Sequence, residues 1–367
     1  MNGSDLVRKS TSVDIDEAKD MEAIDTAGLE ESTISSVRPR IIVSACLGFD
    51  RCRWNDEIIH DPQVERLADH VDFLPICPEC EIGLGVPRAP VRLVMPEKLE
   101  KEEQVGEAPK IRLVQPRTGL DCTQAMCDFI DAFIGRIGDV DGLLLKFRSP
   151  SCGPGDVKIY READKPEVVM RGSGIFASAV KQRFESVPVE DEGRLKNYTI
   201  REHFLSSIFL LARFREVKRL AAMKWLVDFH AAHKFMLLAL NQESLRLLGR
   251  ITANHEKLPI EQVLKAYEHV LHAALRKPPS TAAQINSMEH MFGFFSRRIG
   301  RDERLYFLDL LEEFRRGAMP LSVPIGILKS WALRFEEQYL LHQQIFEPFP
   351  TALEDPSDSA AHKRSAK

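Results

Sequence analysis

The sequence of 367 residues lacks a long apolar run, a concentrated cluster of positive charge and a regular spacing of its cysteines. No stretch approaches the ~18 consecutive apolar residues that a membrane-spanning helix needs. The opening residues, MNGSDLVRKS, lead into acidic sequence and not into the apolar core of a signal peptide. We therefore expect a cytosolic protein with no membrane partner. Because the cytosol keeps thiols reduced, the seven cysteines are not expected to form a disulfide framework, so metal binding and thiol chemistry must be considered.

Charge is nearly balanced, with 50 Lys and Arg against 55 Asp and Glu, but it is unevenly distributed. Residues 1–37 carry nine acidic and three basic side chains and no apolar stripe, which predicts a disordered acidic tail. Residues 201–350 carry 21 basic and 16 acidic side chains. That excess falls short of the basic stripe of a dedicated nucleic-acid binder, so a nucleic-acid partner is left open but is not strongly indicated.

Hydrophobic patterning divides the chain into two bodies, and 44% hydrophobic residues can fill the cores of both. In residues 38–185, short apolar or β-branched runs alternate with loops and amphipathic pieces, which predicts an α/β domain with a mainly parallel sheet. Its predicted strands are residues 41–45, 73–76, 110–114 and 142–147. Residues 200–350 have long segments with a period of 3.6 residues, which predict an all-α helical domain. We expect a polar linker at residues 186–199 and a disordered tail at residues 351–367.

Three predicted strands end at or lead into a cysteine: Cys46, Cys77 and Cys152. In an open parallel sheet the carboxyl ends of the strands meet at one edge, where ligands bind, so these thiols are expected to converge. Turn residues follow each cysteine, and their backbone N–H groups can stabilise a thiolate or the sulfide of a cluster.

Several kinds of chemistry suit these cysteines. Three thiolates on a four-iron cluster leave one iron open, and that iron can bind a substrate sulfur as a Lewis acid. Zinc is the alternative, since Cys46 with Cys52 and Cys77 with Cys80 could supply four thiolates. Core packing is a third interpretation, and residue chemistry alone weighs these three about equally. Dithiol redox chemistry through Cys77 and Cys80 is the weakest, because no cation stands between them to lower a thiol pKa.

Four blocks of sequence favour the iron–sulfur interpretation. They are SACLGFDRCRWND at residues 44–56, LPICPECEIGLGVPRAP at 74–90, LLLKFRSPSCG at 143–153 and GSGIFA at 172–177. In this order they resemble the signature blocks of domain-of-unknown-function family 523, whose characterised members are thiouracil desulfidases. The resemblance implies an oxygen-sensitive 4Fe–4S cluster whose open iron takes sulfur from a thiolated pyrimidine, while water replaces that sulfur without net redox change. It implies Cys46, Cys77 and Cys152 as the cluster ligands, with Cys80 as the substitute for Cys77.

The same resemblance implies Glu79 and Ser149 as acid/base groups beside the open iron. A carboxylate can deprotonate the attacking water, and a hydroxyl can donate to the pyrimidine. Arg88 lies in a Pro-flanked turn and is a candidate for binding a substrate carbonyl or anion, with a surface ion pair as the equally weighted alternative. Where the family has an aromatic-Asp-Gly turn, this chain has Trp54-Asn55-Asp56, so no role is carried over to that acidic position.

The helical half resembles a second family, domain-of-unknown-function 1722, also called the YbgA family. The similar pieces are FHAAHKFMLLALNQ at residues 229–242, INSMEHMFGFFSRRI at 285–299, RRGAMPLSVPIGILKSW at 315–331 and YLLHQQIFEPFP at 339–350. That resemblance implies no activity. His230 and His233 lie near one helix face, where interhelical hydrogen bonding is favoured over a ligand site.

Two classes of function remain. The first is a desulfidase that uses a 4Fe–4S cluster on a small thiolated nucleobase, with the helical domain shaping access, binding a larger substrate or forming a homo-oligomer. The second is a non-catalytic module in which a metal such as zinc only stabilises the α/β domain, while the helical domain binds nucleic acid or a protein.

Overall fold

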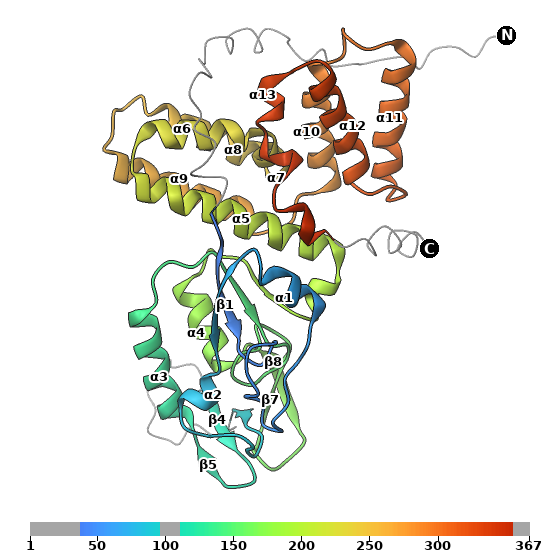
Figure 1. The fold of residues 1–367 in the computed structure, drawn as a ribbon. Coiled ribbons are helices and arrows are strands. Elements are labelled where there is room, and N and C mark those ends of the chain that lie inside the picture. The colour runs from blue at the N-terminus through green and yellow to red at the C-terminus, as the bar shows by residue number, and fades with distance from the viewer. Residues whose placement is uncertain (1–36, 96–110, 355–367) are drawn as a thin grey trace, which may run out of the picture. The chain divides into compact units, whose positions relative to one another are not determined.

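Strand β1 (Arg40–Ser44) is an inner strand of a four-stranded sheet in the computed structural model, which describes residues 37–95 and 111–354. Its three β-branched residues are fully buried: Ile41, Ile42 and Val43. Such a run is typical of a parallel strand covered on both faces. β1 pairs in parallel with β2 (Asp72–Ile76) and β6 (Gly142–Leu145), and β6 pairs in parallel with β9 (Val189–Asp191). The order β2–β1–β6–β9 confirms the parallel sheet expected from the sequence (Figure 1).

Two segments expected to be irregular hold ordered structure. Residues 186–199, expected as a linker, contain β9 and the one-turn helix η2 (Arg194–Lys196). The polar composition predicted a linker, but β9 is a three-residue strand at the edge of the sheet, where polar side chains are accommodated. The one-turn helix η4 (Thr351–Leu353) lies in the expected C-terminal tail, and its Leu353 is buried. The remainder of the two expected tails, residues 1–36 and 355–367, lies outside the described residues.

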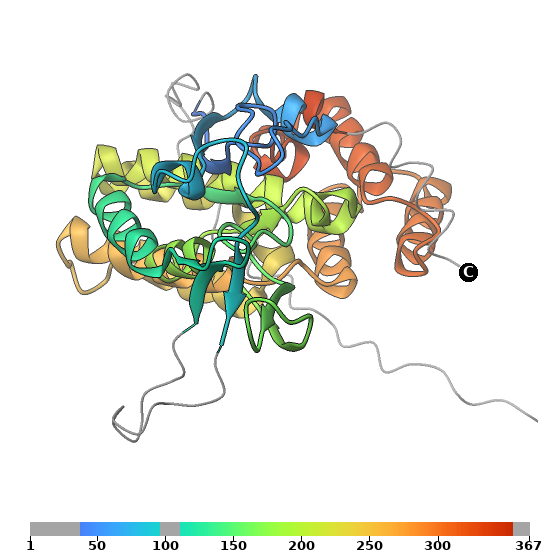
Figure 2. The same ribbon diagram turned by 90° about the horizontal axis from the view of Figure 1, so that it is seen from below.

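A second, mixed sheet was not foreseen. Its order is β5–β4–β3–β7–β8, with β3 and β7 parallel and the other pairs antiparallel. The strands are β3 (Arg92–Val94), β4 (Arg112–Gln115), β5 (Leu120–Asp121), β7 (Val157–Tyr160) and β8 (Val168–Gly172). Figure 2 shows β3 and β4 side by side. The predicted strand at residues 110–114 corresponds to β4 and belongs to this sheet, whose strands are too short to give a clear alternating pattern.

Helices cover both faces of the parallel sheet. The helices of this half are α1 (Pro62–Leu67), α2 (Pro78–Glu81), α3 (Thr123–Arg136) and α4 (Ile175–Arg183). Met126 of α3 and Phe176 of α4 share a core with Ile42 and Leu143 of the sheet. The other face carries α1 and a long helix that begins beyond β9.

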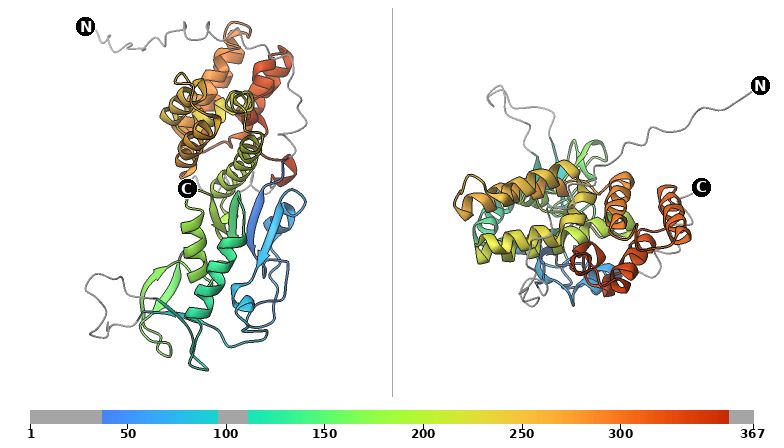
Figure 3. Two further views of the ribbon diagram at one scale, coloured as in Figure 1. Left: turned by 90° about the vertical axis from the view of Figure 1, so that its left-hand side faces the viewer. Right: turned by 90° about the horizontal axis from the view of Figure 1, so that it is seen from above.

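That long helix, α5 (Tyr198–Leu220), packs directly on the sheet. Its Phe204, Leu205 and Ile208 lie in one core cluster with Ile41 and Val43 of β1. The approach requires a glycine on β6, because a Cβ at Gly142 would lie 2.7 Å from Ile208 Cγ2. Asn197 caps the helix by accepting a hydrogen bond from the backbone N–H of Ile200. Figures 1 and 3 show α5 between the sheet and the remaining helices.

The rest of the chain is helical, as the sequence predicted. The helices are α6 (Met223–Ala232), α7 (Lys234–Leu240), α8 (Gln242–Ala253), α9 (Ile260–Leu275), α10 (Thr281–Gly293), α11 (Arg301–Arg315), α12 (Ser322–Arg334) and α13 (Gln338–Leu341), followed by the one-turn helix η3 (Gln344–Phe346). α9 contacts the second face of α5, where Phe214 stacks on Tyr267 with ring centroids 5.4 Å apart. None of the helices in the described ranges is both long and apolar enough to cross a membrane.

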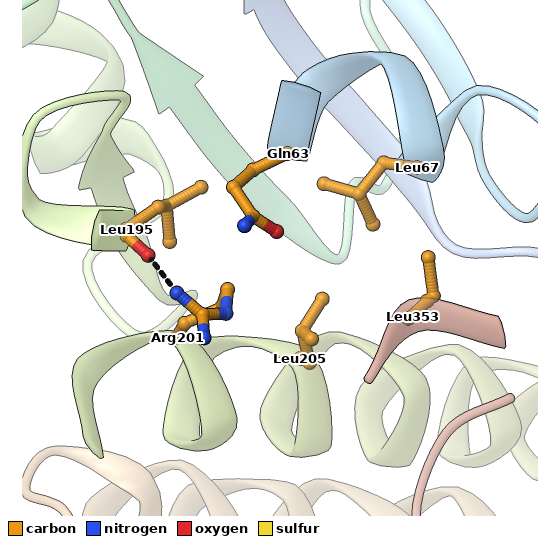
Figure 4. Close-up of a pocket in the computed structure, with 6 residues that line it drawn as sticks. All are labelled: Gln63, Leu67, Leu195, Arg201, Leu205 and Leu353. Atoms are coloured by element: carbon orange, nitrogen blue, oxygen red, sulfur yellow. Dashed lines mark hydrogen bonds between the residues drawn. The ribbon is translucent and has the colours of Figure 1, made fainter. Parts of the chain in front are cut away.

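A small cavity marks the junction of α1, η2, α5 and η4. Its volume is about 10 Å³, room for about one water molecule, and leucine side chains form most of its wall (Figure 4). At its edge Arg201 of α5 donates to the carbonyl oxygen of Leu195 at 2.7 Å. It is a packing defect and too small for a substrate.

An ion pair also fixes α5 to the α/β half. Arg215 Nη2 lies 2.9 Å from Asp141 Oδ2, and the Asp141 side chain is only 3% exposed. Burial raises the pKa of Asp141, while the hydrogen bonds and charge of Arg215 oppose that rise. The carboxylate also accepts the backbone N–H of Arg40, so β1, β6 and α5 meet at this group.

We expect Arg215→Met to lower the free energy of unfolding by about 3 kcal/mol, because it leaves the buried Asp141 carboxylate without its cation. Thermal or urea unfolding measures the change. Arg315→Met is the matched control, since it removes an exposed pair with Glu312 inside helix α11 and should change stability little. Equal effects of the two substitutions would contradict the role given to Arg215.

Candidate functional site

A cavity of about 220 Å³ lies beyond the carboxyl ends of β1, β2 and β6. Its wall contains six of the seven site residues expected from the sequence: Cys46, Cys77, Glu79, Arg88, Ser149 and Cys152. They come from the segments that follow three different strands, with Glu79 in α2, as the topology of a parallel sheet predicts. Cys80 is not part of the wall, but its Sγ lies 3.6 Å from Arg88 Nη1.

Five cysteines gather at this cavity. Cys46, Cys52 and Cys152 are buried, and Cys77 and Cys80 are half-buried. The thiols of Cys77 and Cys80 both donate to the backbone carbonyl oxygen of Cys52, at 3.6 and 3.7 Å, and the Cys52 thiol interacts with those of Cys46 and Cys77. Outside the zinc alternative, Cys52 was expected only to neighbour the loop that carries Cys46, but it lies in the cavity wall. Its spacing of six residues from Cys46 was the available signal.

The protein environment raises the pKa values of four of these thiols, those of Cys52, Cys77, Cys80 and Cys152, and so favours their protonated form. Contact with Cys46 raises the pKa of Cys52 to about 12, and burial raises that of Cys80 to about 11. Burial also raises the pKa of Cys152, while a hydrogen bond from the Ser44 hydroxyl opposes the rise. A metal must therefore displace protons from the thiols that it binds, so metal binding at this site is linked to proton release.

The Glu79 carboxylate is held at both oxygens. Oε1 accepts a hydrogen bond from the Ser151 hydroxyl at 2.9 Å, and Oε2 accepts one from Arg88 Nε at 2.9 Å and lies 2.8 Å from Arg88 Nη2. The side chains of Arg88 and Glu79 are 4% and 12% exposed, so this is a buried ion pair and not a surface one. Ser151, which the sequence analysis missed, is fully buried.

Arg88 uses all five of its N–H donors inside the protein. Besides Glu79, it donates to the carbonyl oxygens of Cys52 and Gly85, each at 2.8 Å, and it approaches the sulfurs of Cys77 and Cys80. Burial lowers the pKa of Arg88, but the charge and hydrogen bonding of Glu79, together with the nearby Cys77 and Cys80, outweigh burial and raise the pKa above its ordinary value. The guanidinium in this arrangement organises the cavity wall.

The Ser149 hydroxyl has its acceptor sites filled. Its Oγ accepts the backbone N–H groups of Ser151 at 3.3 Å and Cys152 at 3.1 Å. Because both lone pairs of the hydroxyl are used, its hydrogen is available to donate into the cavity. Ser149 therefore suits the role of a hydrogen-bond donor better than that of a base.

The fourth sequence block, GSGIFA, supports the loop that carries Ser149 and Cys152. The backbone N–H of Gly174 donates to the carbonyl oxygen of Gly153, and the N–H groups of Ile175 and Ala177 donate to Pro150 and Ser151. A Cβ at Gly174 would lie 2.4 Å from the carbonyl oxygen of Ser151. Only glycine allows this approach of the two segments.

A second ion pair lies at the cavity wall and was not predicted. Lys146 Nζ donates to Glu192 Oε1, and the backbone N–H of Phe147 donates to Glu192 Oε2 at 2.9 Å. Lys146 lines the cavity, whereas Glu192 directly follows the edge strand β9. The pair escaped the sequence analysis because residues 186–199 were assigned to a linker.

The turn at Trp54-Asn55-Asp56 has a backbone that suits glycine. Asp56 stands where the family has glycine, and its φ of 58° lies in the left-handed region that glycine favours. The acidic position of the pattern is Asn55, whose buried Oδ1 has no hydrogen-bond partner among the described residues.

The histidines of the helical half take part in packing. His230 is hydrogen-bonded through Nδ1 to the Tyr267 hydroxyl of α9 at 3.1 Å, and His233 donates through Nδ1 to the carbonyl oxygen of Phe229 at 2.7 Å. Burial lowers the pKa values of His230 and His233 to about 4 and about 3, so both are neutral near pH 7. For His230 the expected interhelical hydrogen bond is confirmed.

The donor chemistry of the cavity fits a thiolate-bound group. In residues 37–95 and 111–354, no three His, Cys, Asp or Glu side chains are arranged to hold a single metal ion. The thiols of Cys46, Cys77 and Cys152 instead lie around one cavity, and a multi-iron cluster needs ligands spread around it in that way.

Two family models match the chain in succession. Residues 41–192 match 2-thiouracil desulfurase, and residues 234–350 match DUF1722, a family of unknown function. The uncharacterized protein YbgA of Escherichia coli K12 is 27% identical over 129 residues, which are 35% of this chain and 76% of YbgA. The uncharacterized protein YbbK of Bacillus subtilis 168 is 27% identical over 154 residues, 41% of this chain and 96% of YbbK. A solved structure of a 4Fe–4S-dependent thiouracil desulfidase, TudS, is 29% identical and covers 43% of this chain and 94% of its own, with a TM-score of 0.32.

The buried pair of Glu79 and Arg88 can be tested by a double-mutant cycle. Arg88→Met should lower the free energy of unfolding by about 3 kcal/mol, because it leaves a buried carboxylate uncompensated. Adding Glu79→Gln should recover at least about 1 kcal/mol of that loss, since the carboxylate is then gone. Urea unfolding of the four proteins gives the coupling, and simple additivity would speak against a buried pair.

Proposed function

The chain joins a domain of the 2-thiouracil desulfurase family at residues 41–192 to a DUF1722 domain at residues 234–350, and on this premise we propose that it desulfurises a thiolated pyrimidine or a related thioamide heterocycle. The reaction converts C=S to C=O with water and releases hydrosulfide. One observation carries the proposal: cysteines, a carboxylate and a serine from widely separated segments line a single cavity. The cavity is large enough for a small heterocycle, and the cytosol suits a site that depends on reduced thiols.

Cys46, Cys77 and Cys152 would hold a 4Fe–4S cluster, with Cys80 as the substitute ligand behind Cys77. When bound, such a cluster with three thiolate ligands supplies an open iron that acts as a Lewis acid toward sulfur. The Ser44 hydroxyl donates to the Cys152 sulfur and so favours its thiolate form. Cys52 contacts Cys46 and Cys77 and completes the sulfur-rich wall.

Glu79 would serve as the base that activates water. It forms a buried ion pair with Arg88, and a carboxylate in an ion pair is the form that accepts a proton. A carboxylate has about four acceptor sites, so the bonds to Ser151 and Arg88 leave room for a water molecule. Once protonated, the same group can return the proton to the departing sulfur.

Ser149 would orient the heterocycle. Its hydroxyl hydrogen is the one polar element of that side chain left to a ligand, so it would donate to a pyrimidine carbonyl oxygen or an unprotonated ring nitrogen. Such a bond strengthens as negative charge develops on the ring during water attack. The helical domain would shape access to the cavity or bind the remainder of a larger substrate.

The ligand assignment predicts a loss of iron. Cys46→Ser, Cys77→Ser and Cys152→Ser should each lose most iron and sulfide and the visible absorption of thiolate-bound iron in anaerobic preparations. Cys127→Ser on α3 is the control and should keep them. Full iron content in all three variants would refute the assignment. If Cys80→Ser loses its iron while Cys77→Ser keeps it, Cys80 and not Cys77 is the second ligand. Zinc in place of iron in the native protein would favour a structural metal module.

The acid/base assignment predicts a different result. Glu79→Gln and Ser149→Ala should keep iron and sulfide but lose turnover of thiouracil by about 100-fold or more, because each removes one proton-transfer or donor group. Release of hydrosulfide from thiouracil under anaerobic conditions measures the rate. Rates within a few-fold of the native value would exclude these roles.

A further inference from the structure

Four basic side chains line the cavity, and they differ in the donors that they retain for a ligand: Arg53, Arg88, Lys146 and Arg148. Arg88 has none left, as described above. Arg53 is paired with Glu57 at 2.6 Å, and Arg148 is paired with Asp156 and is 55% exposed at the rim. Lys146 is less exposed, at 20%, and therefore interacts more strongly with a charge inside the cavity.

Lys146 has a donor to spare. An ammonium group carries three N–H bonds. Its Nζ donates to Glu192 Oε1 and to the carbonyl oxygen of Phe147, the latter at 3.3 Å, and it has no third partner within residues 37–95 and 111–354. Lys146 is one of the residues that line the cavity, and its third N–H is the donor that we assign to a molecule bound there.

Glu192 fixes the position of this ammonium group. It is 8% exposed and lies just beyond β9, and its two oxygens bind the side chain of Lys146 and the backbone N–H of Phe147. The backbone N–H of Lys146 in turn donates to Ser44 Oγ at 2.8 Å. Both ends of Lys146 are therefore anchored, which lowers the entropy lost when it binds a ligand.

We propose that Lys146, and not Arg88, binds the negatively charged form of the thiolated heterocycle, and that Glu192 positions it. The proposal rests on the proposed function. An N–H beside C=S is more acidic than one beside C=O, because sulfur takes up the resulting negative charge more readily. An ammonium donor thus binds the ionised thio compound through a charge-assisted hydrogen bond and binds the neutral oxo product more weakly. Lys146 would select substrate over product and favour product release.

The test compares two ligands that differ in their ability to ionise. Binding of 2-thiouracil, and of its analogue methylated on both ring nitrogens, is measured anaerobically on native protein and on Lys146→Met. The substitution should weaken binding of 2-thiouracil about 10-fold or more and leave the affinity for the methylated compound unchanged. Lys146→Arg should restore part of the selectivity, Glu192→Gln should lose part of it, and the exposed Lys158→Met should have no effect.

Iron content and KM against kcat separate this inference from collapse of the site. Iron at the native level, with a raised KM for 2-thiouracil, supports the inference; equal loss of binding for both compounds, or no loss, overturns it. If native protein binds 2-thiouracil through Lys146 but releases no hydrosulfide, the proposed function fails and the inference stands. If Lys146→Met turns over 2-thiouracil and still prefers it to the methylated analogue as strongly as the native protein does, the inference fails and the proposed function stands. Native protein that binds neither compound would overturn both.

Discussion

The Arg88 guanidinium is the interaction on which the cavity depends. It pairs with Glu79 of α2, the helix directly after β2, and donates to the carbonyl oxygen of Cys52 on the loop after β1, while its own backbone N–H donates to the carbonyl oxygen of Trp54. Burying such a pair costs several kcal/mol per ion, which is recovered only where every donor meets an acceptor. Here all five donors do so, and the spacing of the cysteine loops from the carboxylate is consequently set before any ligand binds.

Helix α5 unites the two halves of the chain. The first family match ends at residue 192 and the second begins at residue 234, so α5 lies in neither. Yet its Phe204 and Ile208 complete the core of the parallel sheet, and its Phe214 packs on Tyr267 of the helical half. Because the sheet holds the cavity at its far edge, the helical half is connected to the site through a continuous packed core.

The sequence predicted what periodicity and strand ends can encode. Buried β-branched runs identified β1 and β6, and the cysteines beyond the strands located the cavity wall. It did not predict β9, because a three-residue edge strand with polar side chains resembles a linker. For the same reason it did not identify Glu192, which follows β9, as a residue of the site. Nor did it predict that Arg88 is saturated while Lys146 is not, because hydrogen-bond partners distant in sequence decide that difference.

Gly142 restricts where the two halves of such a protein can be recombined with those of another. The 2.7 Å between a Cβ placed there and Ile208 makes strand β6 and helix α5 a matched pair, so a change on one side constrains the other. Recombination that exchanged helical halves at residue 192 would separate the pair and leave apolar residues of β1 uncovered. An exchange point after Ala221, where the chain turns in the left-handed region, would keep it intact. The unit that can be exchanged intact is therefore the parallel sheet together with α5, and it extends beyond residue 192, where the first family match ends.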